Sequence, residues 1–127
     1  MEIRETMNKQ REIKFRFYDK TDKRMKYFDS IWNMPDPSYD FDDIQQFTGL
    51  LDKNGKEIFE GDIVKIAGHT DNDVVIFKDG AFCIEGWTNT LAELMTDWSS
   101  NVDPELIEVI GNVHENPELL KEIKLKL

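Results

Sequence analysis

Three short apolar runs separated by two turn signals occupy residues 47–64, which read FTGLLDKNGKEIFEGDIV. Each run is shorter than a stable helix requires. Asn54 and Gly55 form the centre of the first turn signal, because both residue types accept a positive φ at low cost. Residues 60–62, Glu-Gly-Asp, form the second signal. The pattern predicts a small β-meander that makes one side of a barrel.

A hairpin is predicted near the amino terminus. Ile13, Phe15 and Phe17 alternate with Lys14, Arg16 and Tyr18, which is the period of a half-buried strand. The polar residues 19–23 can turn the chain, and residues 25–28 supply a second short strand. The segment 29–43 contains two prolines and several aspartates, which favour a long loop. Within it, Trp32 and Tyr39 are expected to hold the loop against the body.

A second hairpin and a short helix are predicted later in the chain. Asp79-Gly80 is a hairpin turn signal between the apolar runs 74–77 and 81–84. Thr90 and Glu93 have the spacing of a capping box, which marks the start of a helix. The apolar residues that recur at helical intervals after this point are Leu91, Leu94, Met95 and Trp98.

The last part of the chain predicts a closing strand and a terminal helix. Val109, Ile110 and Val113 indicate the strand, around Gly111. Asn116-Pro117-Glu118 then gives an N-cap residue, a first-turn proline and an acid that suits the helix dipole. This order predicts a short helix from Pro117 to about residue 124.

The length of 127 residues fits one domain with one core. We expect residues 1–10 to be a flexible extension and residues 11–127 to form the single domain. Met1 and Met7 are both possible natural starts.

Charge is unevenly distributed along the chain. Residues 1–26 carry nine Lys and Arg against five Asp and Glu, whereas residues 27–127 carry seven against twenty-one. The net charge of −10 opposes non-specific binding to nucleic acid, which requires a positive surface. We expect the basic segment to sit against the acidic remainder, within one subunit or between subunits.

Cys83 is the only cysteine, so an intramolecular disulfide and a cysteine-based zinc site are excluded. Its apolar neighbours indicate a buried thiol. The amino terminus lacks the apolar region of a signal peptide, and no apolar run reaches the roughly 20 residues that span a membrane. We therefore expect a cytoplasmic protein that does not enter the membrane.

Two groups of carboxylates are candidates for metal binding. Residues 69–73, His-Thr-Asp-Asn-Asp, offer oxygen ligands at alternate positions, but Ile76 and Phe82 stand where a calcium loop needs Gly and Glu. Glu57, Glu60 and Asp62 resemble the carboxylate set of a metal-dependent hydrolase. We favour ordinary turns in both places, because no Lys or His accompanies the second group at recognisable spacing.

Other candidate chemistry also has a simpler interpretation. His69 and His114 lie near no nucleophile with an elbow or oxyanion motif around it, so we expect no catalytic triad. Lys14 and Arg16, with Tyr18, Arg24 and Lys26 nearby, could make a small basic and aromatic platform for nucleic acid. The overall charge favours a polar outer strand instead. For the apolar residues Trp87, Leu91, Leu94 and Trp98, a partner-binding stripe and core packing stay open.

Three blocks of sequence resemble the YopX family of bacteriophage and prophage proteins. They are REIKFRFYD (Arg11–Asp19), the segment 47–64 quoted above, and EVIGNVHENPELL (Glu108–Leu120). The resemblance extends over residues 11–120. The family has no established activity, so no catalytic residue can be carried over. The positions that match its central motif have no assigned role and are Thr48, Gly49, Asp52, Gly55, Gly61 and Asp62.

The resemblance implies a mainly β fold, an SH3-like partial barrel with an N-terminal hairpin and one or two short helices. It also implies a phage-encoded accessory protein that forms a homo-oligomer. We expect it to act without catalysis, metal or cofactor, through contacts with itself or with a host or phage protein. The alternatives from other classes are a nucleic-acid binder or acidic nucleic-acid mimic, and a metal-dependent hydrolase using Glu57, Glu60 and Asp62.

Overall fold

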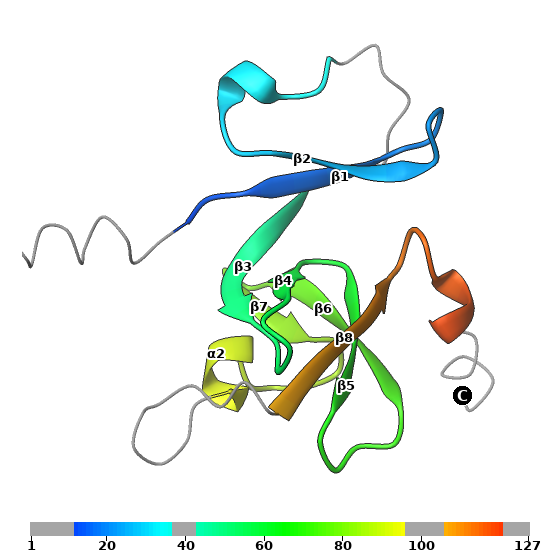
Figure 1. The fold of residues 1–127 in the computed structure, drawn as a ribbon. Helices are drawn as coiled ribbons and strands as arrows, with labels where there is room; N and C mark the ends of the chain where they lie inside the picture. Colours follow the sequence, from blue (N-terminus) through cyan, green and yellow to red (C-terminus); the bar gives the residue numbers. More distant parts are fainter. Residues whose placement is uncertain (1–11, 37–42, 96–105, 121–127) are drawn as a thin grey trace, which may run out of the picture.

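A computed structural model describes residues 12–36, 43–95 and 106–120, and these form a mainly β fold built from two antiparallel sheets (Figure 1). The first sheet has the strand order β2-β1-β3-β4 and the second β7-β6-β5-β8. The strands are β1 (Phe15–Asp19), β2 (Arg24–Phe28), β3 (Gln45–Leu51), β4 (Glu57–Phe59), β5 (Asp62–Ile66), β6 (Asn72–Lys78), β7 (Ala81–Ile84) and β8 (Ile107–Asn112). The helical turns are η1 (Ile31–Asn33), α2 (Leu91–Leu94) and η3 (Pro117–Leu120). The predicted fold class, a mainly β partial barrel, is confirmed.

The main hydrophobic core lies inside the partial barrel. Its side chains come from β4, β5, β6, β7, α2 and β8 and are Ile58, Val64, Ile66, Val75, Ile84, Leu91, Met95, Ile107 and Val109. Burying a side chain of this kind contributes roughly 1.5–3 kcal/mol before the entropy of ordering it is subtracted. Cys83 is buried beside this core, as predicted.

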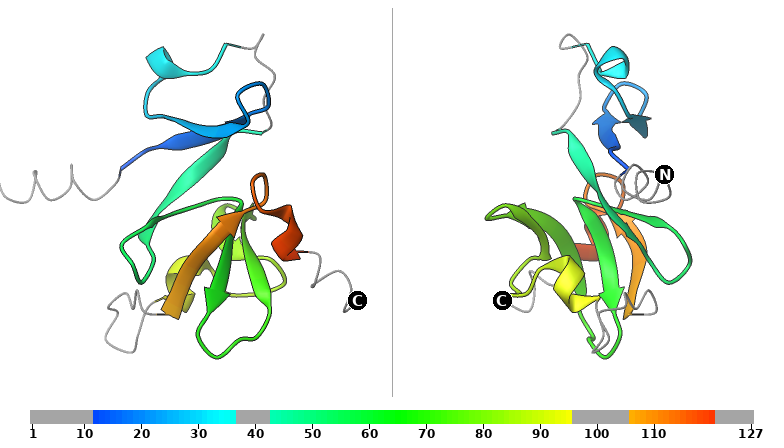
Figure 2. Two further views of the ribbon diagram at one scale, coloured as in Figure 1. Left: turned by 45° about the vertical axis from the view of Figure 1, so that its right-hand side comes forward. Right: turned by 90° about the vertical axis from the view of Figure 1, so that its left-hand side faces the viewer.

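The N-terminal hairpin lies outside the barrel. Figures 1 and 2 show β1 and β2 on one side of it, joined to it by the long strand β3. β1 pairs with β3 only at Gln45 and Gln46, after which β3 continues into the barrel beside β4. The segment that contains η1 passes over the side of the hairpin away from the barrel.

The predicted meander at residues 47–64 is only half correct. β3 and β4 form the expected hairpin, with Gly55 at a φ of 79° in its turn. β4 and β5, however, belong to different sheets, so the second turn carries the chain from one sheet to the other. There the Gly61 N–H donates to the carbonyl of Val75 on β6 at 2.7 Å. This contact with a distant strand redirects the chain, which a local turn signal does not reveal.

Other local predictions are confirmed. Asp79 and Gly80, at φ of 53° and 82°, join β6 to β7 in the conformation that a two-residue hairpin turn needs. Thr90 and Glu93 form both hydrogen bonds of the capping box at α2. The helical pattern predicted beyond Met95 includes Trp98, which lies outside the described residues.

The carboxyl-terminal prediction needs one correction. A 3₁₀ helix begins at Pro117, while its predicted extension beyond Leu120 lies outside the described residues. The Asn116 side chain does not cap this helix. Its Oδ1 accepts from the Asn112 N–H at 3.2 Å, and a Cβ on Gly111 would lie 2.6 Å from the same oxygen. Packing against β8 therefore determines the orientation of Asn116.

The flexible extension expected at residues 1–10 also lies outside the described residues. In the part of the chain that is described, no helix has the length and apolar character needed to cross a membrane.

Candidate functional site

The polar face of the N-terminal hairpin meets the barrel and its apolar face points away, which is the reverse of what the sequence suggests. Lys14, Arg16 and Tyr18 point toward the barrel, whereas the alternating apolar residues point away from it. Lys14 pairs with Glu57 on β4, and this hydrogen-bonded partner raises the pKa of Lys14. Arg16 is only 4% exposed. The basic platform considered at Lys14 and Arg16 therefore does not form as an exposed surface.

Arg16 is the centre of a buried polar network between hairpin and barrel. Its Nη2 donates to Asp62 Oδ1 at 2.7 Å, and its Nε donates to Gln45 Oε1 at 2.8 Å. Its guanidinium lies 4.7 Å from the centre of the Phe59 ring. Burial raises the pKa of Asp62, and the positive charge of Arg16 acts in the opposite direction. A buried carboxylate and a buried guanidinium thus hold the hairpin against the point where β4 passes into β5.

His114 extends this junction along the same, barrel-facing side of the hairpin. Its ring stacks on Tyr18 with centroids 5.6 Å apart, and its Nε2 lies 3.3 Å from Gln45 Nε2. The structure places His114 half-buried between the turn after β8 and β1. Its contacts are those of a packing residue.

Phenylalanines occupy the opposite face of the hairpin. Phe15 and Phe28 are paired across β1 and β2 with ring centroids 5.3 Å apart, and Phe17 lies 6.2 Å from Phe28. None of them belongs to the barrel core. This face, which we call the outer face, is therefore a second apolar surface separate from the barrel interior.

The outer face carries an apolar groove of about 390 Å³. Its lining is Ile13, Phe15, Phe28, Asp29, Ser30, Met34 and Ile44. Met34 is 51% exposed and Ile13 is 49% exposed. Trp32, in the neighbouring turn η1, is 88% exposed, so it does not hold the loop against the body as we expected. Tyr39 lies outside the described residues.

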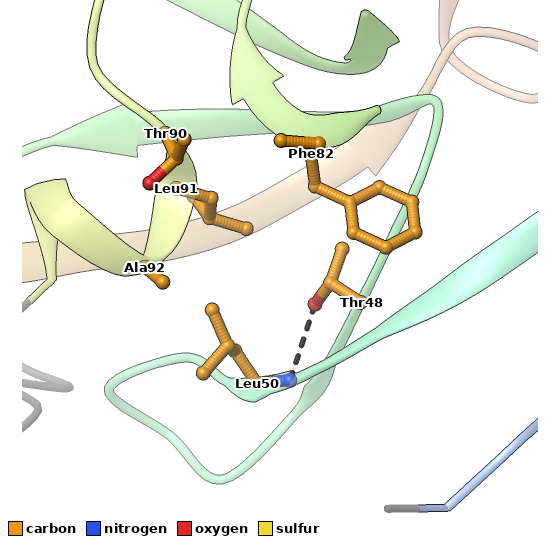
Figure 3. Close-up of a pocket in the computed structure, with 7 residues that line it drawn as sticks. Thr48, Leu50, Phe82, Thr90, Leu91 and Ala92 are labelled. Atoms are coloured by element: carbon orange, nitrogen blue, oxygen red, sulfur yellow. Dashed lines mark hydrogen bonds between the residues drawn. The ribbon is translucent and has the colours of Figure 1, made fainter. Parts of the chain in front are cut away.

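A smaller cavity of about 250 Å³ lies between β3, β7 and the start of α2 (Figure 3). Its apolar lining includes Leu50, Phe82 and Leu91. Thr48 Oγ1 donates to the Ile58 carbonyl at 2.7 Å and accepts from the Leu50 N–H at 3.2 Å (Figure 3). The threonine thus ties β3 to β4 beside the cavity. Leu91, Trp87 and Leu94 pack on the barrel core, which supports core packing over a partner-binding stripe for these three residues.

The three carboxylates considered for metal-dependent hydrolysis serve separate structural contacts. Glu57 binds Lys14, and Glu60 Oε1 accepts from the Gln46 N–H at 3.2 Å. Asp62 faces Arg16, and its second oxygen accepts from a backbone N–H of β4. No cluster of three metal-ligating side chains occurs among residues 12–36, 43–95 and 106–120.

The turn at residues 69–73 is held by a side-chain contact. His69 Nδ1 lies 2.8 Å from Asp73 Oδ2, and the His69 ring meets the Trp87 ring edge-on at 5.5 Å. Asp73 is buried. The predicted connection is shorter than expected, because Asn72 and Asp73 already belong to β6 and pair with β5.

The motif positions of the central segment have structural roles. Asp52 is buried; its Oδ1 accepts from the Asn54 and Lys56 N–H groups and its Oδ2 from the Val109 N–H, each at 2.8 Å. It therefore shapes the β3–β4 turn and fastens it to β8. Gly49, Gly55 and Gly61 have positive φ, and Asp62 joins β4 to the hairpin. These residues build the barrel and leave the outer face as the best candidate for function.

Sequence reasoning missed the outer face because its residues come from separate segments. The alternation at residues 13–17 shows two faces but not which one meets the barrel. Met34 and Ile44 lie at the two ends of a segment that the sequence predicts only as a loop. The exposed Trp32 beside them was the one available signal, since a large aromatic residue in a polar loop is a frequent feature of binding surfaces.

Comparisons with known proteins agree with the resemblance found in the sequence. A family model described as YopX protein matches residues 36–121. No curated protein matches the chain significantly. Among solved structures, the crystal structure of protein EF1440 from Enterococcus faecalis is similar, with a TM-score of 0.55 and 28% sequence identity. The match covers 85% of this chain and 97% of that one.

Proposed function

Because the chain belongs to the YopX family, we propose that it is a phage- or prophage-encoded accessory protein that binds other protein surfaces through the outer face of its hairpin. It acts without catalysis, in the cytoplasm of the bacterial host. The phage origin rests on the family resemblance, and the genes that flank this one test it.

The exposed apolar surface on the outer face carries the proposal. Single exposed apolar residues are ordinary, but a group that borders a concave apolar groove is typical of a binding surface. Ile13, Met34 and Ile44 are each 38–51% exposed and border the same groove. The cost of leaving them in water is removed when a partner covers them.

The structural use of the polar residues supports a non-catalytic role. Asp52 and Asp62 are buried and bonded within the fold, and Arg16 is buried between the hairpin and the barrel. A hydrolase would need such groups free to meet a substrate or a metal. A nucleic-acid binder would need the cations exposed.

The test is affinity capture from infected or lysogenic cells with three tagged proteins: wild type, Met34→Glu and Phe77→Glu. Met34 is 51% exposed on the groove, and Phe77 is 52% exposed on β6 of the barrel. The two substitutions therefore add one charge each at equally exposed apolar sites. We expect partners bound by wild type to be retained by Phe77→Glu and lost by Met34→Glu. Equal capture by all three folded proteins would overturn the proposal.

A further inference from the structure

The outer face combines an apolar groove with an acidic rim. We propose that the groove binds a basic segment of a partner protein, in which one or two large aliphatic side chains are flanked by Lys or Arg. This inference rests on the proposed function, because it uses the same groove and names the chemistry of the partner.

The groove has room for aliphatic side chains. Its exposed walls are Ile13, Met34 and Ile44. A volume of about 390 Å³ is near the low end of the range for ligand sites, which is about 300–1,000 Å³. The groove therefore accommodates a few protruding side chains of a partner and not a large folded surface. Aliphatic side chains gain from burial there, because they need no polar group to pair with.

Carboxylates surround the groove. Asp29 lines it, and Asp43 and Glu12 each directly precede one of its lining residues. All three are exposed. Glu12 Oε1 lies 3.3 Å from Lys14 Nζ. Asp29 and Asp43, in contrast, form no ion pair among the described residues, so two uncompensated negative charges lie beside the apolar walls.

The cations of the hairpin lie away from this rim. Lys14 and Arg16 form ion pairs on the barrel side. Lys26 pairs with two aspartates at the turn end of the hairpin. Arg24 is four residues before Phe28, or about 13 Å along a strand, and charges are screened over about 8 Å at physiological salt. The field at the groove is therefore negative and attracts a cationic partner.

Trp32 gives a second reason to expect Lys or Arg in the partner. It lies in η1 beside the groove, two residues before Met34, and is 88% exposed. A cation over the face of a tryptophan ring is attracted by the ring more strongly than by other aromatic side chains. The exposed ring and the unpaired carboxylates thus favour the same kind of side chain.

Anionic occupants are disfavoured by the same charges. Nucleic acid or the surface of an anionic membrane would bring phosphates against Asp29 and Asp43, and like charges repel. An acidic protein segment meets the same repulsion. The groove therefore discriminates among partners by charge as well as by shape.

Fluorescence anisotropy with three labelled peptides tests the inference on the full chain. The first peptide, called the lysine peptide, has two leucines separated by a serine, with two lysines on each side. The second replaces its lysines by glutamates, and the third replaces its leucines by serines. We expect the lysine peptide to bind at least about tenfold more tightly than either of the others at low salt. A lysine peptide that binds no better than the other two, or not at all, would overturn the inference.

Matched variants locate the contact. Asp29→Lys is expected to weaken binding of the lysine peptide about fivefold, and Glu85→Lys, which reverses another exposed carboxylate beside β7, less than about twofold. Met34→Ser should weaken binding more than Phe77→Ser, which removes an equally exposed apolar side chain from the barrel. The NMR signal of the Trp32 indole N–H should shift when the peptide is added. Equal losses for Asp29→Lys and Glu85→Lys would mean that the net charge is responsible and the rim is not, which refutes the inference.

These outcomes separate the inference from the proposed function. If the partners captured from cells depend on Met34 but the protein prefers the glutamate or serine peptide, the groove still binds a protein and the inferred chemistry is wrong. If the protein binds phosphatidylglycerol vesicles through Met34 and does not bind the lysine peptide, the groove is a lipid site, and both the inference and the proposed function are wrong.

Discussion

Replacing Arg16 with methionine should loosen the hairpin from the barrel. The change in the free energy of unfolding then measures what the buried ion pair with Asp62 contributes. Methionine retains much of the apolar stem but removes the guanidinium that binds Asp62, Gln45 and the Glu60 carbonyl. Asp62 is 2% exposed, so its carboxylate would then be buried without its cation.

The expected loss in the free energy of unfolding is about 3–5 kcal/mol at neutral pH. This is the cost of removing one partner from a buried ion pair and leaving the other charge uncompensated. The lost contact with the Phe59 ring contributes about 0.5–2 kcal/mol more. Domains of this size have a total stability of about 5–15 kcal/mol, so the variant should be close to the limit of folding.

The loss should depend on pH in one direction. Burial raises the folded-state pKa of Asp62 above its ordinary value of 3.8. The resulting contribution to stability is fully present below about pH 3.8 and is lost as pH rises through the folded-state pKa. Without Arg16 the folded-state pKa rises further, because the opposing positive charge is gone. The difference between wild type and Arg16→Met should therefore be small in acid and grow toward neutral pH.

Urea unfolding of wild type, Arg16→Met, Asp62→Asn and the double variant between pH 3.5 and 8 measures this difference. At neutral pH the double variant should be more stable than Arg16→Met alone, since it lacks the uncompensated charge. Amide hydrogen exchange should speed up across β1 and β2 before the barrel core. A difference between wild type and Arg16→Met that is constant with pH would refute the reasoning, because it would mean that Asp62 is not the source of the cost.

Three further substitutions test other contacts that stabilise the fold, by thermal or urea unfolding. Asp52→Ala removes the acceptor of three backbone N–H groups and should cost at least about 3 kcal/mol, and a loss below 1 kcal/mol would contradict its role. Gly61→Ala places a Cβ 2.0 Å from Gln45 at a φ of 86°, so it should destabilise more than Gly68→Ala, whose Cβ meets nothing within 4 Å at a φ of 82°. Thr90→Ala should cost about 1 kcal/mol through loss of the α2 cap, and an unchanged midpoint would contradict it.

Local elements were predictable where short-range chemistry decides the conformation. The Asp79-Gly80 turn forms because both residues tolerate a positive φ, and the Thr90 cap forms because its partner is three residues away. The β3–β4 hairpin follows from the same local logic at Gly55. The family and the mainly β class followed from these blocks taken together.

Features that depend on distant residues were not predictable from the sequence pattern. Arg16 and Asp62 are 46 residues apart, and no local sequence pattern around either residue predicts that the two side chains form an ion pair. Asp52 looks like an ordinary turn residue until Val109, 57 residues later, is seen to donate to it.

The amino-acid sequence alone determined which residues of the hairpin share a face, since side chains alternate along any strand. Tertiary structure decided which face meets the barrel. The buried carboxylate of Asp62 and the ring of Phe59 draw Arg16 inward, and the phenylalanines therefore face outward. The junction therefore buries a paired charge, and the apolar side chains that remain, among them Ile13 and Phe15, line the groove on the side of the hairpin away from the barrel.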